Sequence, residues 1–166
     1  MADPETGGAI LGEACHFVDL MYWLLDSEPV SVAAYSLPAG QKDPAGLNNL
    51  CSSFHFADGS VANFTYTTNG NRKFTSERVE VFAPGVSAAA EDFKRFQLHG
   101  SAVRFSPARW FPEKGHRQQL ERFFQNLRKG GQAEVTVLDG ARATVCCLRM
   151  LQSAQAQAAI SIDWQS

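Results

Sequence analysis

The feature that most constrains this chain is an Asp58-Gly59 pair set between two segments in which apolar and polar residues alternate. Residues 50–56 precede the pair and residues 60–68 follow it. Asp-Gly supplies the positive φ angles of a two-residue hairpin turn, so the two segments are predicted to be neighbouring strands. Consecutive strands joined by tight turns pair in an antiparallel way.

Further strands are predicted wherever the same alternation is bounded by turn residues. They cover residues 30–35, 77–83 and 86–98, with a short last strand at 159–163.

Helical periodicity marks three segments, in which apolar residues recur at three- and four-residue steps. The first covers residues 10–25, the second covers 115–129, and the third begins with Asp139 as its N-cap. Helices at both ends of the chain must cover one face of the sheet. The predicted fold class is therefore α+β: an open, predominantly antiparallel sheet with helices packed on one face.

Length and composition narrow the class of protein. A chain of 166 residues, 45% of them hydrophobic, is expected to form a single domain over residues 1–166. No apolar run reaches the roughly 20 residues of a membrane helix, and the acidic N-terminus lacks the order of a signal peptide. We therefore expect a cytoplasmic protein. A net charge of −2 gives no case for binding nucleic acid or a membrane surface.

Four cysteines without a C-x-x-C spacing suggest neither a disulfide framework nor a zinc site. They are expected to be reduced and mostly buried thiols.

A histidine on the first predicted helix is the strongest candidate for chemistry. At about 100° per residue, Gly12, His16, Asp19 and Trp23 fall on one narrow face. A glycine in a helix interior costs about 1 kcal/mol relative to alanine, and here it leaves open space above the imidazole. That space suits a ligand.

The neighbours of His16 suggest proton transfer. Asp19 can hydrogen-bond one ring nitrogen and leave the other free to exchange a proton with a substrate, and Glu13 adds a second carboxylate at the rim. The alternative is a purely structural histidine with Asp19 as its local partner. A metal site of His16, Asp19 and Cys15 is disfavoured because Cys15 points away from His16 around the helix, so no metal is predicted. No nucleophile elbow, Walker loop or G-x-G-x-x-G motif is present.

Residues 7–20, GGAILGEACHFVDL, resemble the glycine-rich loop and H-x-x-D helix that open the C-terminal domain of the Gfo/Idh/MocA oxidoreductases. The order of elements downstream is also similar, including the Asp-Gly hairpin and a helix that ends in Gly130-Gly131. The likeness spans nearly the whole chain. Members of that family are two-domain, NAD(P)-dependent enzymes that act on sugars, cyclitols and related alcohols.

The resemblance implies different roles for the two domains of the family. In the family, an N-terminal Rossmann domain holds the nucleotide and supplies a catalytic lysine, whereas the C-terminal domain binds substrate on an open sheet and makes the subunit interface. Residues 1–166 would then be the C-terminal domain with the Rossmann domain absent. NAD or NADP is expected in the full-length enzyme, none is expected to bind this chain alone, and the isolated domain is expected not to turn over.

The resemblance also assigns roles to single residues. His16 matches the family's catalytic histidine, which exchanges the proton of the substrate hydroxyl, and Asp19 matches the acidic residue that orients it. Gly7 and Gly8 match the loop near the cofactor. One departure is notable, because many members carry an aspartate one turn before the histidine. Here that position is a glycine, and Glu13 lies one step later, about 60° further round the helix; either Glu13 reaches the substrate or the chain binds a different polyol.

A homo-oligomer is expected through the open face of the sheet. The reason is a set of aromatic residues that cannot all face the helices if the strands alternate. These are Phe54, Phe56, Phe64, Tyr66, Phe82 and Phe93.

Two other functions stay open at this point. The chain can be a free-standing, non-catalytic interaction or dimerisation domain that uses the same sheet face. It can also be a small-ligand or phosphate-binding module built on Arg104, Arg109, Lys114 and Arg117.

Overall fold

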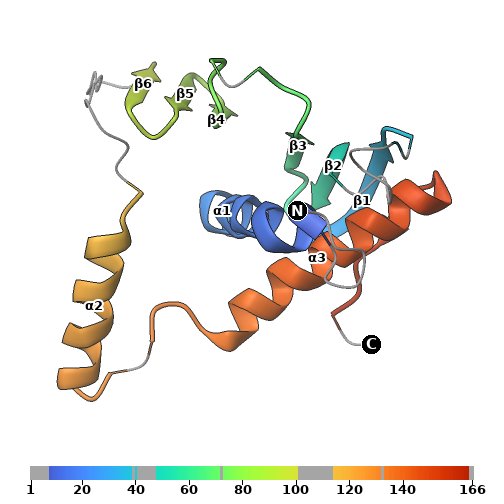
Figure 1. Ribbon diagram of the computed structural model, residues 1–166. Coiled ribbons are helices and arrows are strands. Elements are labelled where there is room, and N and C mark those ends of the chain that lie inside the picture. The colour runs from blue at the N-terminus through green and yellow to red at the C-terminus, as the bar shows by residue number, and fades with distance from the viewer. Residues whose placement is uncertain are drawn as a thin grey trace. The chain divides into compact units, whose positions relative to one another are not determined.

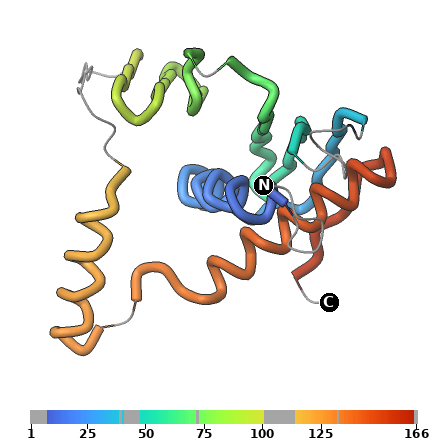
Figure 2. The backbone as a smooth tube through the Cα atoms, in the orientation of Figure 1, coloured from blue at the N-terminus to red at the C-terminus, as the bar shows by residue number. Residues whose placement is uncertain are grey.

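The computed structural model describes residues 8–38, 40, 48–71, 73–100, 114–131 and 133–164. They belong to two compact units. The first unit joins Met1–Asn69 to Val135–Ser166, and the second is Gly70–Glu134. The first unit thus brings the two ends of the chain together, with the blue and red segments side by side in Figure 2.

A four-stranded antiparallel sheet forms the base of the first unit (Figure 1). Its strands lie in the order β3 (Val61–Thr67), β2 (Asn49–Phe56), β1 (Pro29–Ser36) and β7 (Ile160–Ser161). The predicted hairpin is confirmed between β2 and β3, where Gly59 adopts a φ of +88°. The Asp58 carboxylate accepts hydrogen bonds from the backbone N–H and hydroxyl of Ser60, which fixes the turn.

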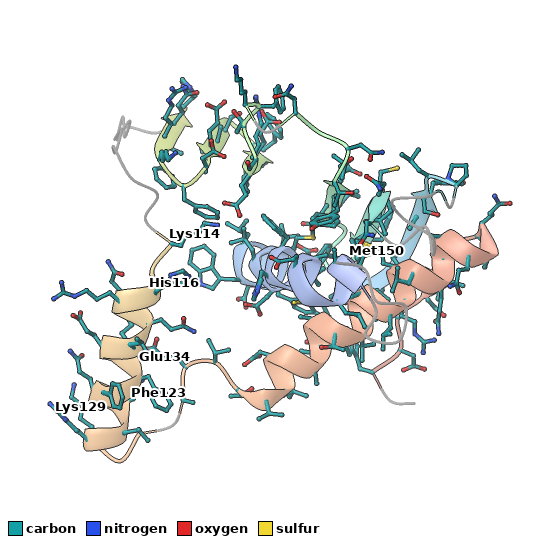
Figure 3. The ribbon with its side chains drawn as sticks, viewed as in Figure 1. Lys114, His116, Phe123, Lys129, Glu134 and Met150 are labelled. Atoms are coloured by element: carbon teal, nitrogen blue, oxygen red, sulfur yellow. The ribbon has the colours of Figure 1, made fainter. Side chains whose placement is uncertain are left out.

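Two helices cover one face of this sheet (Figure 1). The π-helix η2 (Ile10–Ala14) leads into α1 (Cys15–Leu25), and α3 (Val137–Ala156) packs against both α1 and β1. Tyr22 of α1 meets the ring of Phe56 edge to face at 6.4 Å, and Met150 of α3 accepts a hydrogen bond from Ser52 at 3.1 Å (Figure 3). Both contacts lie on the same face of β2.

The third helix begins earlier than predicted. Its N-cap is Thr136, and Asp139 is the third residue of a capping box rather than the cap itself. The Thr136 hydroxyl accepts from the Asp139 backbone N–H, while the Asp139 carboxylate accepts from the Thr136 backbone N–H at 2.7 Å. This reciprocal arrangement satisfies two donors at the start of the helix and starts it at Val137.

The core lies between the sheet and the two helices. Every second residue of β2 faces it, so Leu50, Ser52, Phe54 and Phe56 are buried whereas Cys51 and His55 are exposed. The prediction that six aromatic residues cannot all face the helices holds, because Phe82 in the second unit is 75% exposed. All four aromatic residues of β2 and β3 lie on the helix-covered side, with Phe64 buried and Tyr66 packed against the core.

A buried serine ties α3 to β1. The hydroxyl of Ser153 accepts from the Ala34 backbone N–H at 2.8 Å and donates to the Ala158 carbonyl at 2.6 Å. Strand β7 pairs only with Ser31 and Val32 of β1, so it is too short to reach the Ala34 N–H. The side chain of Ser153 supplies the missing acceptor.

The second unit holds a three-stranded antiparallel sheet in the order β4 (Arg78–Ala83), β5 (Val86–Glu91) and β6 (Arg95–His99), together with helix α2 (His116–Arg128). The prediction of one strand over 86–98 was wrong, because a turn at residues 92–94 divides it. Asp92 and Phe93 both adopt positive φ angles there without being glycine. Near the end of β6, a Cβ atom on Gly100 would collide with the Gly85 carbonyl, so only glycine fits.

The α+β class with antiparallel pairing is confirmed, but the strands form two sheets instead of one. Helices α1 and α3 cover the four-stranded sheet, whereas α2 belongs to the other unit.

The cysteines are free thiols. Cys146 and Cys147 of α3 are buried, and burial raises the pKa of each thiol to about 12. Cys15 is half-buried, whereas Cys51 on the outer sheet face is exposed, so the expectation of mostly buried thiols fails for this residue.

Candidate active site on helix α1

The residues predicted to carry chemistry lie together on the outer side of the first helix. Ile10, Ala14 and Val18 are buried against the core, since they recur at four-residue steps along the inner side. His16 and Asp19 lie on the other side and are exposed. The amphipathic helix therefore uses its apolar stripe for packing and leaves the imidazole and carboxylate accessible.

Gly12 lies one turn before His16, inside the π-helix. The segment is not the regular α-helix predicted over 10–25, because residues 10–14 form the wider i to i+5 turn. A π-helical turn holds more residues than an α-helical turn. Gly12 and His16, four residues apart, are therefore more nearly aligned along the helix axis than in an ideal α-helix. A Cβ atom built on Gly12 would meet nothing within 4 Å. The position at Gly12 is therefore open.

Asp19 is the site residue with a clear electrostatic perturbation. Burial, followed by the negative charge of Asp139 on α3, raises the pKa of the Asp19 carboxyl, and the nearby His16 works in the opposite direction. Within the described part of the chain, no hydrogen bond joins the carboxylate to the imidazole. The predicted pair is thus a charge interaction in this structure, with both side chains free to meet a ligand.

The other predicted residues surround this pair on different sides. Glu13 is exposed, and its charge, after burial, raises the pKa of the Tyr66 hydroxyl on β3. Gly8 begins the helix with a φ of +64°. Next to it, the Ala9 backbone N–H donates to the Asn48 side chain at 3.3 Å, which fixes the start of the helix beside β2. Gly7 lies outside the described residues.

Trp23 and the first turn of α3 complete the surroundings. Trp23, two turns after His16, is 77% exposed, as its place on the predicted face requires. Sequence reasoning missed the influence of Asp139 on α3, whose negative charge, after burial, raises the pKa of the Asp19 carboxyl. The T-x-x-D spacing from Thr136 to Asp139 marks the capping box, but nothing in the sequence places that turn beside α1.

The basic residues proposed for phosphate binding are not free in the second unit. Lys114 pairs with Glu77 at 2.9 Å and lies 6.0 Å from the centre of the Phe93 ring (Figure 3). Arg117 pairs with Glu121 at 2.8 Å. Arg104 and Arg109 lie outside the described residues. Across the described ranges, no three His, Cys, Asp or Glu side chains are grouped to hold a metal ion.

The sequence matches a known family model over most of its length. The model is that of the GFO/IDH/MocA C-terminal domain, and it covers residues 1–106. These residues include α1 and strands β1, β2 and β3. This chain belongs to that family. The assignment confirms the resemblance carried by the glycine-rich loop and the H-x-x-D helix. None of the curated proteins matches the sequence.

Solved structures share the fold of this GFO/IDH/MocA domain. The myo-inositol 2-dehydrogenase from Lactobacillus plantarum is 21% identical with a TM-score of 0.68, over 95% of this chain and 49% of that one. The aldose-aldose oxidoreductase from Caulobacter crescentus, complexed with glycerol, is 15% identical with a TM-score of 0.73, over 89% and 45%. The WlbA dehydrogenase from Bordetella pertussis, in complex with NADH and UDP-GlcNAcA, is 17% identical with a TM-score of 0.60, over 92% and 44%.

This GFO/IDH/MocA chain spans about half the length of these oxidoreductases. Among the helices of the described segments, none is both long and apolar enough to cross a membrane.

Proposed function

We propose that this chain is the substrate-binding half of an NAD(P)-dependent oxidoreductase that acts on a hydroxyl group of a sugar, cyclitol or related alcohol. The observation that carries the proposal is the exposed His16–Asp19 pair beside the open space at Gly12, in a domain of the GFO/IDH/MocA family. The cytoplasm is the proposed location, where a reducing environment suits four free thiols.

His16 is the proposed acid–base residue. An exposed imidazole can take the proton of a substrate hydroxyl as that carbon is oxidised, and return it in the reverse reaction. Asp19 would orient the ring and stabilise its charged form, because the two side chains are one turn apart and already interact electrostatically. Glu13 would contact a second hydroxyl from the β3 side.

The cofactor fits this side of α1 only in part. The uncovered position at Gly12 and the helix start at Gly8 suit a flat nicotinamide ring next to the substrate. When bound, NAD or NADP accepts or donates the hydride. The sequence contains no G-x-G-x-x-G loop for the pyrophosphate. A nucleotide-binding domain, in the same chain or in another, would have to hold the rest of the cofactor.

The outer face of the four-stranded sheet is the proposed subunit interface. Most of its residues are small or polar, and no Lys, Arg, Asp or Glu occurs among them: Ser31, Ala33, Tyr35, Cys51, Ser53, His55, Val61, Asn63 and Thr65. Depletion of charge is typical of the buried centre of an interface. The same observation supports the second candidate function, a non-catalytic interaction domain that uses this face.

Calorimetry distinguishes the two functions. NAD(H) and NADP(H) are titrated into the 166-residue chain and into the longest reading frame that contains it. We expect binding only by the longer protein, because the phosphate-binding loop is not in this sequence. Binding by neither protein would overturn the dehydrogenase proposal and leave the interaction domain as the better account.

Mutation then tests the site in the nucleotide-binding protein. We expect His16→Gln to lower kcat with sugars or cyclitols by about 100-fold or more, with nucleotide affinity unchanged. The matched control is His116→Gln, which alters an exposed histidine at the start of α2 in the second unit. Equal rates for both variants would exclude His16 as the acid–base residue.

A further inference from the structure

The start of the first helical segment is held by a side chain that comes from the sheet. The backbone N–H of Ala9, next to the left-handed Gly8, donates to Oδ1 of Asn48 at 3.3 Å. The first N–H groups of a helix have no partner within the helix, so another acceptor has to satisfy them. Here the acceptor lies 39 positions further along the chain, directly before β2. The sheet thus caps the helix.

Asn48 is a built part of this junction rather than a surface residue. It is only 5% exposed, and burial of a carboxamide is costly unless it is hydrogen-bonded. The next residue, Asn49, is 4% exposed, but its Oδ1 accepts from the Thr67 hydroxyl at 2.8 Å and from the Thr68 backbone N–H at 2.9 Å. Two adjacent buried asparagines therefore have different partners: Asn49 holds the end of β3, whereas Asn48 holds the start of the helix.

A second contact fixes the same helical segment to the sheet further along. The ring of Phe17 lies 5.8 Å from the ring of Phe64 on β3, centre to centre. The segment is thus attached to the sheet at Ala9 and again at Phe17. Gly12 and His16 lie between these two attachments. The Asn48 hydrogen bond is therefore the one that fixes the glycine end of the segment relative to the imidazole.

We propose that Asn48 is a positioning residue for the reaction assigned to His16: its buried carboxamide holds Gly8 and Ala9 in a fixed place relative to Gly12 and His16. The inference rests on the proposed function and deepens it. Gly8 and Gly12 are the positions offered to the nicotinamide ring, so the hydrogen bond controls where that ring would lie relative to the imidazole. A displacement of about 1 Å between reacting groups can lower a rate by about 100-fold.

Three substitutions at the start of β2 test this role. Asn48→Leu has a similar shape but removes the acceptor, so the Ala9 N–H loses its partner. Asn48→Asp keeps an acceptor oxygen, and a carboxylate is favourable at the start of a helix. Asn49→Leu is the matched control, since it removes an equally buried carboxamide that binds Thr67 and Thr68 instead.

The first measurement is exchange of the Ala9 amide proton with solvent, followed by NMR in the 166-residue chain without cofactor or substrate. We expect Asn48→Leu to accelerate this exchange by about 10-fold, the effect of one lost hydrogen bond, beyond any change in global stability measured by urea unfolding. Asn48→Asp and Asn49→Leu should leave it close to the wild-type rate. Unchanged exchange in Asn48→Leu would overturn the inference.

The second measurement is steady-state kinetics in the nucleotide-binding protein with sugars or cyclitols. Asn48→Leu should lower kcat by about 10- to 100-fold and leave KM nearly unchanged, because misalignment affects the transition state more than substrate binding. Asn48→Asp should restore most of the wild-type kcat, which a loss of stability alone does not explain. Equal losses in Asn48→Leu and Asn49→Leu, or no rescue by Asn48→Asp, would contradict the positioning role.

Asn48→Ser provides a second variant if Asn48→Leu does not fold, because the shorter side chain cannot reach the Ala9 N–H. The same losses are expected for it. Failure of the proposed function gives a different result, namely no nucleotide binding and no effect of His16→Gln, while the exchange of the Ala9 amide still reports on Asn48.

Discussion

At the scale of single residues, the site is notable for a side chain that it lacks. Gly12 has no steric reason to be glycine, since a Cβ atom there meets nothing within 4 Å and its φ is not positive. A glycine inside a helix lowers stability. Its presence beside His16 is explained if the space is needed by a bound molecule.

Substitution of Gly12 by alanine allows the effect on the stability of the chain to be measured separately from the effect on substrate binding. We expect Gly12→Ala to raise the free energy of unfolding by about 0.5–1 kcal/mol, because alanine loses less conformational entropy in a helix. In the nucleotide-binding protein the same change should raise KM or lower kcat. Chemical denaturation and steady-state kinetics check the two effects.

The matched control is Gly140→Ala, which also fills open space in an exposed turn of a helix. It should stabilise the chain to a similar extent without affecting the reaction. Unchanged kinetics in both variants would show that nothing occupies the space at Gly12.

At the scale of elements, local signals predicted most of the secondary structure. The hairpin at Asp58-Gly59 was predictable because its conformation is set by the two turn residues themselves. The break at Asp92 and Phe93 was not, since a bulky residue such as phenylalanine rarely adopts a positive φ and aspartate does so only occasionally. The start of α3 was misplaced because Asp139 is both a good N-cap and a good third residue of a capping box.

The contact between α3 and β1 depends on one hydroxyl. We expect Ser153→Ala to destabilise the chain by about 2 kcal/mol, since it leaves the buried Ala34 N–H and the Ala158 carbonyl without their partner. Urea unfolding followed by circular dichroism measures the loss. Thr144→Ala on the same helix is the control, because its exposed hydroxyl bonds only to the carbonyl of Gly140 and its removal should cost less than about 0.5 kcal/mol. An equal loss in both variants would contradict the role given to Ser153.

At the scale of the whole molecule, the homo-oligomer stays a prediction, and the reason for it applies to two of the six aromatic residues: Phe82 is exposed and Phe93 lies in a turn. Period-2 alternation correctly separated the two faces of β2, but it did not say which aromatic residues shared a face with the helices. The face left open carries no Lys, Arg, Asp or Glu among its paired residues and includes one large aromatic residue, Tyr35. The site was predictable as a pair on α1, whereas its link to Asp139 depends on helix packing between segments 120 residues apart and leaves no local signal.

The proposed interface predicts a concentration-dependent assembly. Ala33 lies on the open face of β1, which has β2 on one side and β7 on the other. Its partner residue on β2 is Ser53. Ala33→Arg should convert a dimer or larger assembly to monomer in sedimentation equilibrium, because it places an unpaired charge in the contact. Gln155→Arg on the exposed side of α3 should leave the assembly intact. A wild-type chain that stays monomeric at all concentrations would exclude the interface.

The π-helical turn at Ile10–Ala14 determines the angle about the helix axis between the start of the helix and His16. An i to i+5 turn holds one residue more than an α-turn, so the segment behaves as an α-helix with a single residue inserted. Removing one residue from it would allow a continuous α-helix and keep His16 and Asp19 over the same core, while everything before the turn would move by one position. Gly8 and Gly12 would then lie at a different angle about the helix axis relative to His16, which makes the length of this turn as decisive for the site as the identity of its side chains.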